Sequence, residues 1–146
     1  MDSPIGALRL AATARGVSRV CFEGEPLPID APPATPLATQ ELAEYFAGTR
    51  REFTVPLDLR GVTAFREAVL RELITVPYGE TTTYAELARA VGSPRAVRAV
   101  GSACATNPLP LFIPCHRVLR SDGQLGGYRG GVEAKRVLLR MEGIDV

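Results

Sequence analysis

The sequence contains no tryptophan, one histidine, one lysine and three cysteines among its 146 residues. Three widely spaced cysteines, Cys21, Cys104 and Cys115, argue against a disulfide framework and favour a reducing compartment. A single histidine without a Cys-x-x-Cys pair argues against a structural zinc site, so we expect no metal and no cofactor. No stretch approaches the ~20 apolar residues of a membrane span, and the N-terminus lacks a secretory signal pattern. We therefore expect a soluble, cytoplasmic protein with no membrane partner.

The charges are unevenly distributed, although the net charge is only +1. Residues 1–58 contain 5 arginines against 8 acidic residues, whereas residues 59–146 contain 12 basic residues against 8 acidic ones. Genomic base composition can explain why 16 of the 17 basic residues are arginine, but it does not explain the asymmetry. The second half of the chain is therefore suited to a polyanion.

The first half of the chain predicts a small mixed α/β domain, residues 1–58. Gly16 suits a turn between two strands, and five prolines predict an extended segment. The expected elements are strands at 5–12 and 16–22, a surface loop at 24–36, a helix at 37–46 and a short strand at 52–57.

The second half, residues 59–146, predicts a mainly helical domain. Thr63, Thr83 and Ser93 are suited to cap helices. The helices that begin after Thr83 and Ser93 form a helix-turn-helix candidate. The expected elements are helices beginning after Thr63, Thr83 and Ser93, an apolar strand at 111–113, a hairpin turn at 121–123, a glycine-rich loop at 125–131 and a terminal helix ended by Gly143.

Cys115 and His116 form the sharpest local feature of the sequence. A thiol becomes a nucleophile as the thiolate, and an imidazole within reach, directly or through one water, can remove its proton. Pro114 and Arg117 bracket the pair, where a rigid backbone can aim both side chains. The alternative is a buried structural cysteine beside a histidine of no chemical role, because cysteine is among the most buried residue types.

Glu142 is the attractive partner for such an imidazole. A carboxylate on the second ring nitrogen fixes the tautomer and stabilises the imidazolium. The alternative is a solvated charge, and a carboxylate in the last turn of a helix is on the unfavourable side of the helix dipole. The sequence leaves both interpretations open.

The segment 113–118, IPCHRV, resembles the active-site region of the methylated-DNA–protein-cysteine S-methyltransferases, or O6-alkylguanine-DNA alkyltransferases. Asn107-Pro108 upstream and the GYRGG run at 127–131 extend that resemblance. The runs PYGETTTY at 77–84 and RAVRAVG at 95–101 are similar to the helix-turn-helix of the family. The resemblance implies a ribonuclease-H-like N-terminal domain and a winged helix-turn-helix-like C-terminal domain.

The resemblance also implies a reaction. Cys115 would take the alkyl group from O6-alkylguanine, and from O4-alkylthymine, and keep it as a thioether, so the protein would act once. His116 would deprotonate Cys115 through a water, with Glu142 behind it. Asn107 would brace the turn that holds Cys115, and Tyr84 would donate its phenolic hydrogen toward the flipped base.

The implied partner is double-stranded DNA containing O6-alkylguanine, bound by a monomer through the minor groove without strong sequence preference. Arg98 would fill the gap left by the extruded base, because a planar cation can stack and hydrogen-bond. Small residues would permit close backbone approach. The implied DNA-binding residues are Tyr84, Ala96, Arg98, Ala99, Gly101, Ser102 and Arg117. Tyr84 and Arg98 each have an alternative as an ordinary packing or solvated residue.

The implied substrate pocket contains a departure from the family pattern. Arg129 stands where several members have a small hydroxyl residue that would bind the leaving guanine oxygen. Gly126 and Gly127 leave room around the alkyl group, which predicts acceptance of adducts larger than methyl. The expected pocket residues are Pro110, Val118, Gly126, Gly127, Tyr128 and Arg129, while Cys104 and Cys21 are expected to be structural.

Three other functions remain open from the sequence. A protein that only binds alkylated DNA would not need Cys115. A transcription regulator would use the helix-turn-helix alone, and would keep sequence-specific binding without that cysteine. A thiol hydrolase built on Cys115, His116 and Glu142 would turn over an ester or amide substrate.

Overall fold

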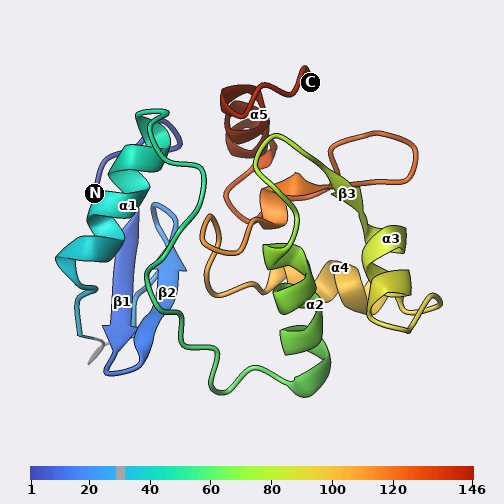
Figure 1. Cartoon of the computed structure of the whole chain (residues 1–146), viewed down its shortest axis with the longest axis horizontal. Coiled ribbons are helices and arrows are strands. Elements are labelled where there is room, and N and C mark those ends of the chain that lie inside the picture. The colour runs from blue at the N-terminus through green and yellow to red at the C-terminus, as the bar shows by residue number, and fades with distance from the viewer. Residues whose placement is uncertain (29–31) are drawn as a thin grey trace. The chain divides into compact units, whose positions relative to one another are not determined.

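The computed structural model describes residues 1–28 and 32–146, and the chain divides into two compact units, Met1–Arg60 and Gly61–Val146 (Figure 1). The middle of the expected proline-rich loop, residues 29–31, lies outside the described residues. None of the helices in the described ranges has both the length and the apolar character needed to cross a membrane.

The N-terminal unit contains the expected hairpin and helix. Strands β1 (Arg9–Thr13) and β2 (Gly16–Cys21) pair in antiparallel fashion, and helix α1 (Pro36–Phe46) begins with a proline in its first turn. Gly16 has a φ of 152°, and a Cβ there would lie 2.4 Å from the carbonyl oxygen of Pro56. Only glycine permits this approach of two backbones. The buried apolar side chains of the unit include Leu8, Val17, Val20, Leu42 and Tyr45.

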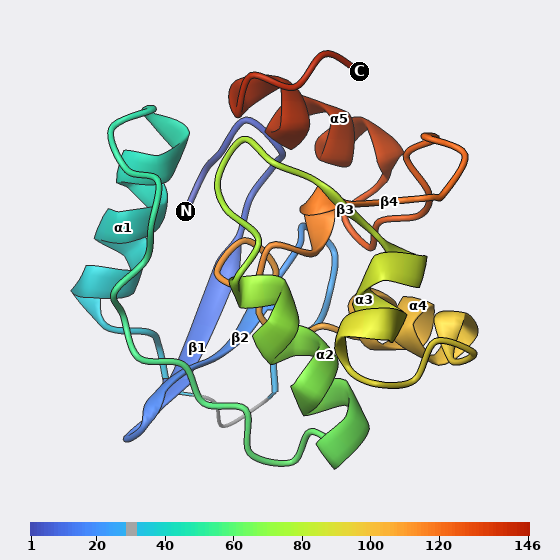
Figure 2. The same cartoon turned by 45° about the vertical axis from the view of Figure 1, so that its right-hand side comes forward.

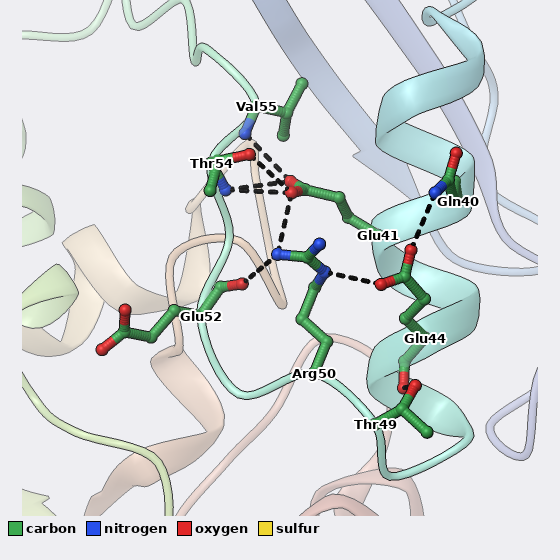
Figure 3. A network of polar contacts seen from close by, with 8 residues as sticks. All are labelled: Gln40, Glu41, Glu44, Thr49, Arg50, Glu52, Thr54 and Val55. Carbon is green, nitrogen blue, oxygen red and sulfur yellow. Dashed lines mark hydrogen bonds and ion pairs between the residues drawn. The ribbon is translucent and has the colours of Figure 1, made fainter.

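The strand expected at 52–57 is wrong, because a buried carboxylate takes its backbone donors. Glu41 of α1 accepts hydrogen bonds from the backbone nitrogens of Thr54 (2.9 Å) and Val55 (2.9 Å) and from the Thr54 hydroxyl (2.7 Å) (Figure 3). Arg50 adds an ion pair at 3.0 Å. Among the described residues, the pairing of this segment with β2 is an isolated bridge between Leu57 and Val17, beside the close approach of Gly16 to Pro56. The segment is therefore attached to a helix by a side chain rather than to the hairpin by a ladder.

The C-terminal unit consists of four α-helices, a one-turn 3₁₀ helix and two very short strands within its described residues, 61–146. Helices α2, α3 and α4 pack against one another, and α5 contacts the 3₁₀ helix η1 (Figure 2). The elements are α2 (Ala64–Ile74), β3 (Thr82–Thr83), α3 (Tyr84–Ala90), α4 (Val97–Ala105), η1 (Cys115–Arg117), β4 (Val118–Leu119) and α5 (Val132–Met141). The expected caps are confirmed at Thr63 and Thr83, whose side chains accept from the backbone nitrogens of Arg66 and Glu86.

Helices α3 and α4 form the expected helix-turn-helix, but the start of α4 differs from the prediction. Ser93 does not cap the helix. Residues 93–96 form a turn closed by a bond from the Ala96 nitrogen to the Ser93 oxygen at 2.9 Å, and α4 begins at Val97. The ring of Pro94 fixes a φ that suits the second position of a turn as well as a first helical turn. The sequence pattern at this point fits both structures.

The apolar strand expected at 111–113 is also wrong. Leu111 has a φ of 78°, the one positive value outside glycine in the described part of the chain. Pro108, Pro110 and Pro114 have no backbone N–H to donate to a ladder. The segment is therefore a buried irregular stretch that leads into η1.

The turn expected at 121–123 is present, but its flanking strand pairs elsewhere. The Gly123 nitrogen donates to the Arg120 oxygen, and the Arg120 nitrogen donates to the Gln124 oxygen, each at 2.9 Å. Strand β4 pairs in parallel with β3, through Thr82 and Val118, rather than across this turn. The pairing attaches the segment after η1 to the start of α3.

Candidate active site

Cys115 lies at the first position of η1, directly after Pro114. Its backbone nitrogen donates to the Ile113 oxygen at 2.8 Å, and its side chain is buried, with 7% of the residue exposed. The thiol lines a hollow of about 400 Å³. The residues around this hollow are Tyr84, Gly101, Cys104, Ala105, Cys115, Gly127, Tyr128 and Arg129.

His116 and Glu142 meet in the interior of the unit. The His116 Nε2 atom lies 2.7 Å from a Glu142 carboxylate oxygen, and both side chains are fully buried. Burial lowers the pKa of His116 below 6.5 although Glu142 opposes this effect, so the imidazole is neutral at pH 7. If Nε2 carries the proton toward Glu142, Nδ1 is the basic nitrogen. That nitrogen is buried and has no hydrogen-bond partner among residues 1–28 and 32–146.

Glu142 caps the C-terminal end of α5, and three donors compensate its unfavourable position. The Arg117 guanidinium donates to both carboxylate oxygens, at 2.8 and 3.1 Å, and the Gly79 nitrogen donates at 3.1 Å. Arg117 also donates to the Val76 oxygen at 2.8 Å and lies over the ring of Tyr78. The solvated alternative for Glu142 is therefore wrong, because the carboxylate is buried and paired.

Asn107 fixes the irregular stretch before Cys115. Its side-chain amide donates to the Ile113 oxygen at 2.9 Å, and its side-chain oxygen accepts from the Leu109 nitrogen at 2.9 Å. The Asn107 side chain also lowers the pKa of the Cys115 thiol. Arg129 in turn donates to the Asn107 backbone oxygen. A single buried asparagine thus connects Arg129, on the wall of the hollow, with the stretch that leads to Cys115.

Burial raises the pKa of the Cys115 thiol above its ordinary value, because the thiolate is poorly solvated there. The hydrogen bond from Asn107 and the positive charges of Arg129 and Lys135 act in the opposite direction. Burial also raises the pKa of Cys104 to about 12, which makes it an inert neutral wall of the hollow. The pKa of Tyr84 is raised by burial as well, so its phenol keeps its hydrogen at neutral pH.

Lys135 is a functional candidate that the sequence analysis did not identify. Its ammonium group is buried and donates to the backbone oxygens of Val118, at 2.6 Å, Leu125 and Gly127. Burial lowers its pKa to about 8. The only lysine of the chain stands three and four residues before the buried Leu138 and Leu139, and this helical spacing is the signal that predicts its burial.

The residues expected to contact DNA fall into two groups. Arg98, Ala99 and Ser102 are exposed on α4, and Ala96 and Gly101 are half-buried. Ser102 also accepts a hydrogen bond from Arg66 at 3.2 Å. Arg117 does not belong to this group, because its guanidinium is buried against Glu142 and Val76. The sequence pattern predicts a phosphate partner for this arginine, two residues after Cys115, whereas its partner is a carboxylate 25 residues away.

The expected substrate pocket is corrected at three positions. Pro110 and Val118 are buried and do not line the hollow beside Cys115. Gly126 is not on its wall either, but it packs against Tyr84, whose hydroxyl oxygen would lie 3.1 Å from a Cβ at that position. Gly127, Tyr128 and Arg129 do line the hollow. Among the described residues, no three histidine, cysteine or carboxylate side chains are grouped to hold a metal ion.

Two family models match this chain. Residues 64–144 match the 6-O-methylguanine DNA methyltransferase, DNA binding domain, and residues 1–59 match the ribonuclease-like domain of the same proteins. The chain belongs to the 6-O-methylguanine DNA methyltransferase family. The expected two-domain architecture, with a ribonuclease-like first domain, is thereby confirmed, and so is the resemblance seen in the sequence.

Relatives named methylated-DNA–protein-cysteine methyltransferase match most of this chain. The methylated-DNA–protein-cysteine methyltransferase of Mycobacterium tuberculosis is 43% identical, over 97% of this chain and 89% of its own length. The constitutive enzyme of that name from Bacillus subtilis is 51% identical, over 74% of this chain and 66% of its own. A crystal structure of Mycobacterium tuberculosis OGT in complex with DNA superimposes with a TM-score of 0.90 and 43% identity, over 97% of this chain and 89% of that one.

Proposed function

We propose that this protein repairs O6-alkylguanine in DNA by transferring the alkyl group irreversibly to Cys115. The observation that carries the proposal is the arrangement at Cys115 itself. A buried cysteine opens onto a hollow beside a helix-turn-helix, and the next residue is a neutral histidine hydrogen-bonded to a carboxylate. The family membership and the DNA complex of its relative OGT support the same function.

The reaction is a displacement at the alkyl carbon. The His116 Nδ1 atom takes the Cys115 proton through one water, and Glu142 stabilises the imidazolium that forms. The sulfur then forms a bond to the alkyl carbon while the bond from that carbon to guanine O6 breaks. The electron pair stays on the guanine, and Tyr84 donates toward the ring to stabilise the developing negative charge. A thioether is not hydrolysed under mild conditions, so each molecule acts once.

DNA binding precedes this step. The exposed helix α4 lies in the minor groove, with Ala99 and Ser102 against the backbone, and Arg98 occupies the space of the flipped nucleotide. Phosphate contacts by the basic C-terminal unit carry no sequence information, so the affinity decreases with salt. Lesion selectivity comes from the easier extrusion of a poorly paired base and from its fit in the hollow. The acting species is a monomer.

The proposal is tested by the mass of the intact protein after incubation with a duplex that contains one O6-methylguanine. We expect one methyl group per protein, on the peptide that contains Cys115, and one equivalent of restored guanine. Cys115→Ala should still bind the duplex but restore no guanine. Several equivalents of product per protein, or restored guanine with Cys115 unmodified, would contradict the proposal.

The same samples separate the other functions. Binding without any mass change indicates a protein that only recognises alkylated DNA. Sequence-specific binding that survives Cys115→Ala indicates a transcription regulator. Turnover of an ester or amide without a burst indicates a thiol hydrolase.

Adducts larger than methyl should also be accepted, because the hollow has about 400 Å³ and Gly127 presents no side chain to it. Single-turnover rates on methylguanine and benzylguanine duplexes measure this property. A benzyl rate slower by several orders of magnitude would contradict it.

A further inference from the structure

The charges that face Cys115 come from several different elements. Arg129 approaches from the glycine-rich loop and Lys135 from α5, and both act on the thiol as positive charges. Tyr84 from α3 and Cys104 from α4 line the same hollow, and both are neutral at pH 7 because burial raises the pKa of each. Arg129 is therefore the one charged side chain among the described residues around the hollow.

The other ionisable groups near Cys115 do not reverse this sign. His116 is neutral, because burial lowers its pKa below 6.5. The Glu142 carboxylate accepts two hydrogen bonds from the Arg117 guanidinium, at 2.8 and 3.1 Å, so its charge is compensated within the interior. Among the described residues of the C-terminal unit, the charges of Arg129 and Lys135 oppose the effect of burial on the thiol.

Arg129 is held in a defined place rather than projecting into solvent. It is half-buried, it lines the hollow together with Cys115, and its Nη1 atom donates to the Asn107 backbone oxygen. The Asn107 side chain donates to the Ile113 oxygen, which also accepts from the Cys115 backbone nitrogen. Asn107 therefore anchors the Arg129 cation and fixes the stretch that carries Cys115.

We propose that Arg129 is a positioning residue for alkyl transfer, whose guanidinium, anchored on Asn107, holds a positive charge against the Cys115 sulfur so that the thiolate forms in a buried site. Lys135 supplies a second charge, but its ammonium also donates to three backbone oxygens. Removing Lys135 would disturb the loop itself, so Arg129 is the charge that can be tested by substitution. This role rests on the proposed function for its purpose, although the charge can be measured without DNA.

The test is the reaction of Cys115 with iodoacetamide in the free protein, from about pH 6 to about pH 10. The sulfur forms a bond to the acetamide carbon, iodide leaves, and only the thiolate reacts at an appreciable rate. Peptide mass assigns the label to Cys115 rather than to Cys21 or Cys104. We compare the wild type with Arg129→Gln, which keeps an amide donor for Asn107 but removes the charge, and with Arg129→Lys, which keeps the charge.

We expect Cys115 in Arg129→Gln to be labelled about tenfold more slowly than in the wild type at pH 7, and at nearly the wild-type rate at high pH. A tenfold loss of thiolate corresponds to a shift of the profile by roughly one pH unit. Arg129→Lys should remain within about threefold of the wild type. The exposed Arg71 on α2 provides the control, since Arg71→Ser removes the same charge elsewhere and should leave the profile unchanged. Arg129→Ser serves as a second neutral variant if Arg129→Gln does not fold.

Two results would overturn the inference. One is a wild-type pH profile of labelling in the folded neutral variants. The other is an equal shift of the profile in Arg129→Lys and Arg129→Gln, which would show that the contact with Asn107 matters and the charge does not. Methyl transfer from the modified duplex is measured in parallel on the wild type. Absence of transfer in the wild type contradicts the proposed function alone, whereas an unshifted profile contradicts the role of Arg129 alone.

Discussion

Each of the two units buries a carboxylate at a helix and pairs it with an arginine. Glu41 in the N-terminal unit binds Arg50 and the backbone nitrogens of Thr54 and Val55. Glu142 in the C-terminal unit binds Arg117 and the Gly79 nitrogen. Both satisfy the requirement that a buried charge be paired and hydrogen-bonded.

The two carboxylates differ in their remaining partner. Glu41 accepts from the hydroxyl of Thr54, at 2.7 Å, and that contact only attaches a loop to a helix. Glu142 accepts from an imidazole whose other nitrogen is buried without a partner among the described residues, and the adjacent residue is a cysteine. Both carboxylates stabilise the fold, but only Glu142 contacts a side chain, His116, that can take up a proton.

The difference between the two carboxylates is tested most strongly by Glu142→Gln. We expect the single-turnover rate of methyl transfer to decrease about 100-fold, because the amide neither fixes the His116 tautomer nor stabilises its cation. Rates are measured at a temperature where circular dichroism shows the variant to be folded. Glu41→Gln is the matched control in the other unit, and a comparable decrease in its rate would show that the two carboxylates do not differ in this way.

The free energy of unfolding should depend strongly on the buried Glu41. Glu41→Gln should lower the free energy of unfolding by about 3 kcal/mol, since it leaves the Arg50 contact and the donors of residues 54 and 55 without a charged acceptor. Glu44→Gln removes the other, more exposed ion pair of Arg50 and should cost less than about 1 kcal/mol. Urea unfolding measures both variants. Equal losses of unfolding free energy in the two variants would show that the burial of Glu41 does not strengthen its contribution to stability.

The two units should also respond to acid in different pH windows. The pKa of His116 is lowered by burial, so as the pH falls through 6.5 the unfolded chain takes up a proton that the folded chain does not. Stability should therefore fall below pH 6.5, by at most about 1.4 kcal/mol per pH unit. Burial raises the pKa of Glu41, but the Thr54 and Val55 hydrogen bonds and Arg50 outweigh it and lower that pKa, so its contribution is lost only below 4.5.

His116 can be followed directly, because it is the only histidine and gives a single pair of imidazole resonances in an NMR spectrum. We expect these resonances to stay at the neutral position at pH 6.5. Half-protonation at that pH would contradict the buried neutral state. His116→Gln should lack the stability slope between pH 6.5 and 4.5.

The smallest effect concerns the backbone around the site. Gly126 and Gly123 both have positive φ values, 73° and 83°, so alanine at either position should cost about 1 kcal/mol. Only at Gly126 would the new Cβ press on the Tyr84 hydroxyl, 3.1 Å away, whereas Gly123 has open space. Gly126→Ala should slow methyl transfer about threefold and Gly123→Ala should not. Equal rates would show that the position of Tyr84 is not limiting.

Local patterns predicted the parts of the fold that depend on neighbouring residues. The hairpin of β1 and β2, the helix α1 and the caps at Thr63 and Thr83 follow from turn residues, apolar spacing and side-chain acceptors. The strands expected at 52–57 and 111–113 failed for a different reason. The donors of Thr54 and Val55 go to Glu41, and prolines flank the second segment on both sides, so neither segment joins a ladder.

In the site, too, features set by neighbouring residues were predictable, whereas contacts between distant segments were not. Cys115, His116 and the helix-turn-helix were visible as motifs, because their chemistry lies in adjacent residues. Arg117 was misassigned and Lys135 was missed, because the partners of each lie on segments 8 to 41 residues away. Charge alone predicts an attraction to phosphate, and only the folded chain shows which cations already bind a carboxylate or backbone oxygens.

The sequence by itself determined the family, the two-part architecture and the cysteine that we propose as the alkyl acceptor, since these depend on residue types at fixed spacings. Only the tertiary structure decided that Glu142 reaches His116, that Arg117 compensates it, and that Arg129 and Lys135 leave a positive charge at the sulfur. The physical reason is that burial and pairing set the pKa of an ionisable group, and both are properties of segments brought together by folding.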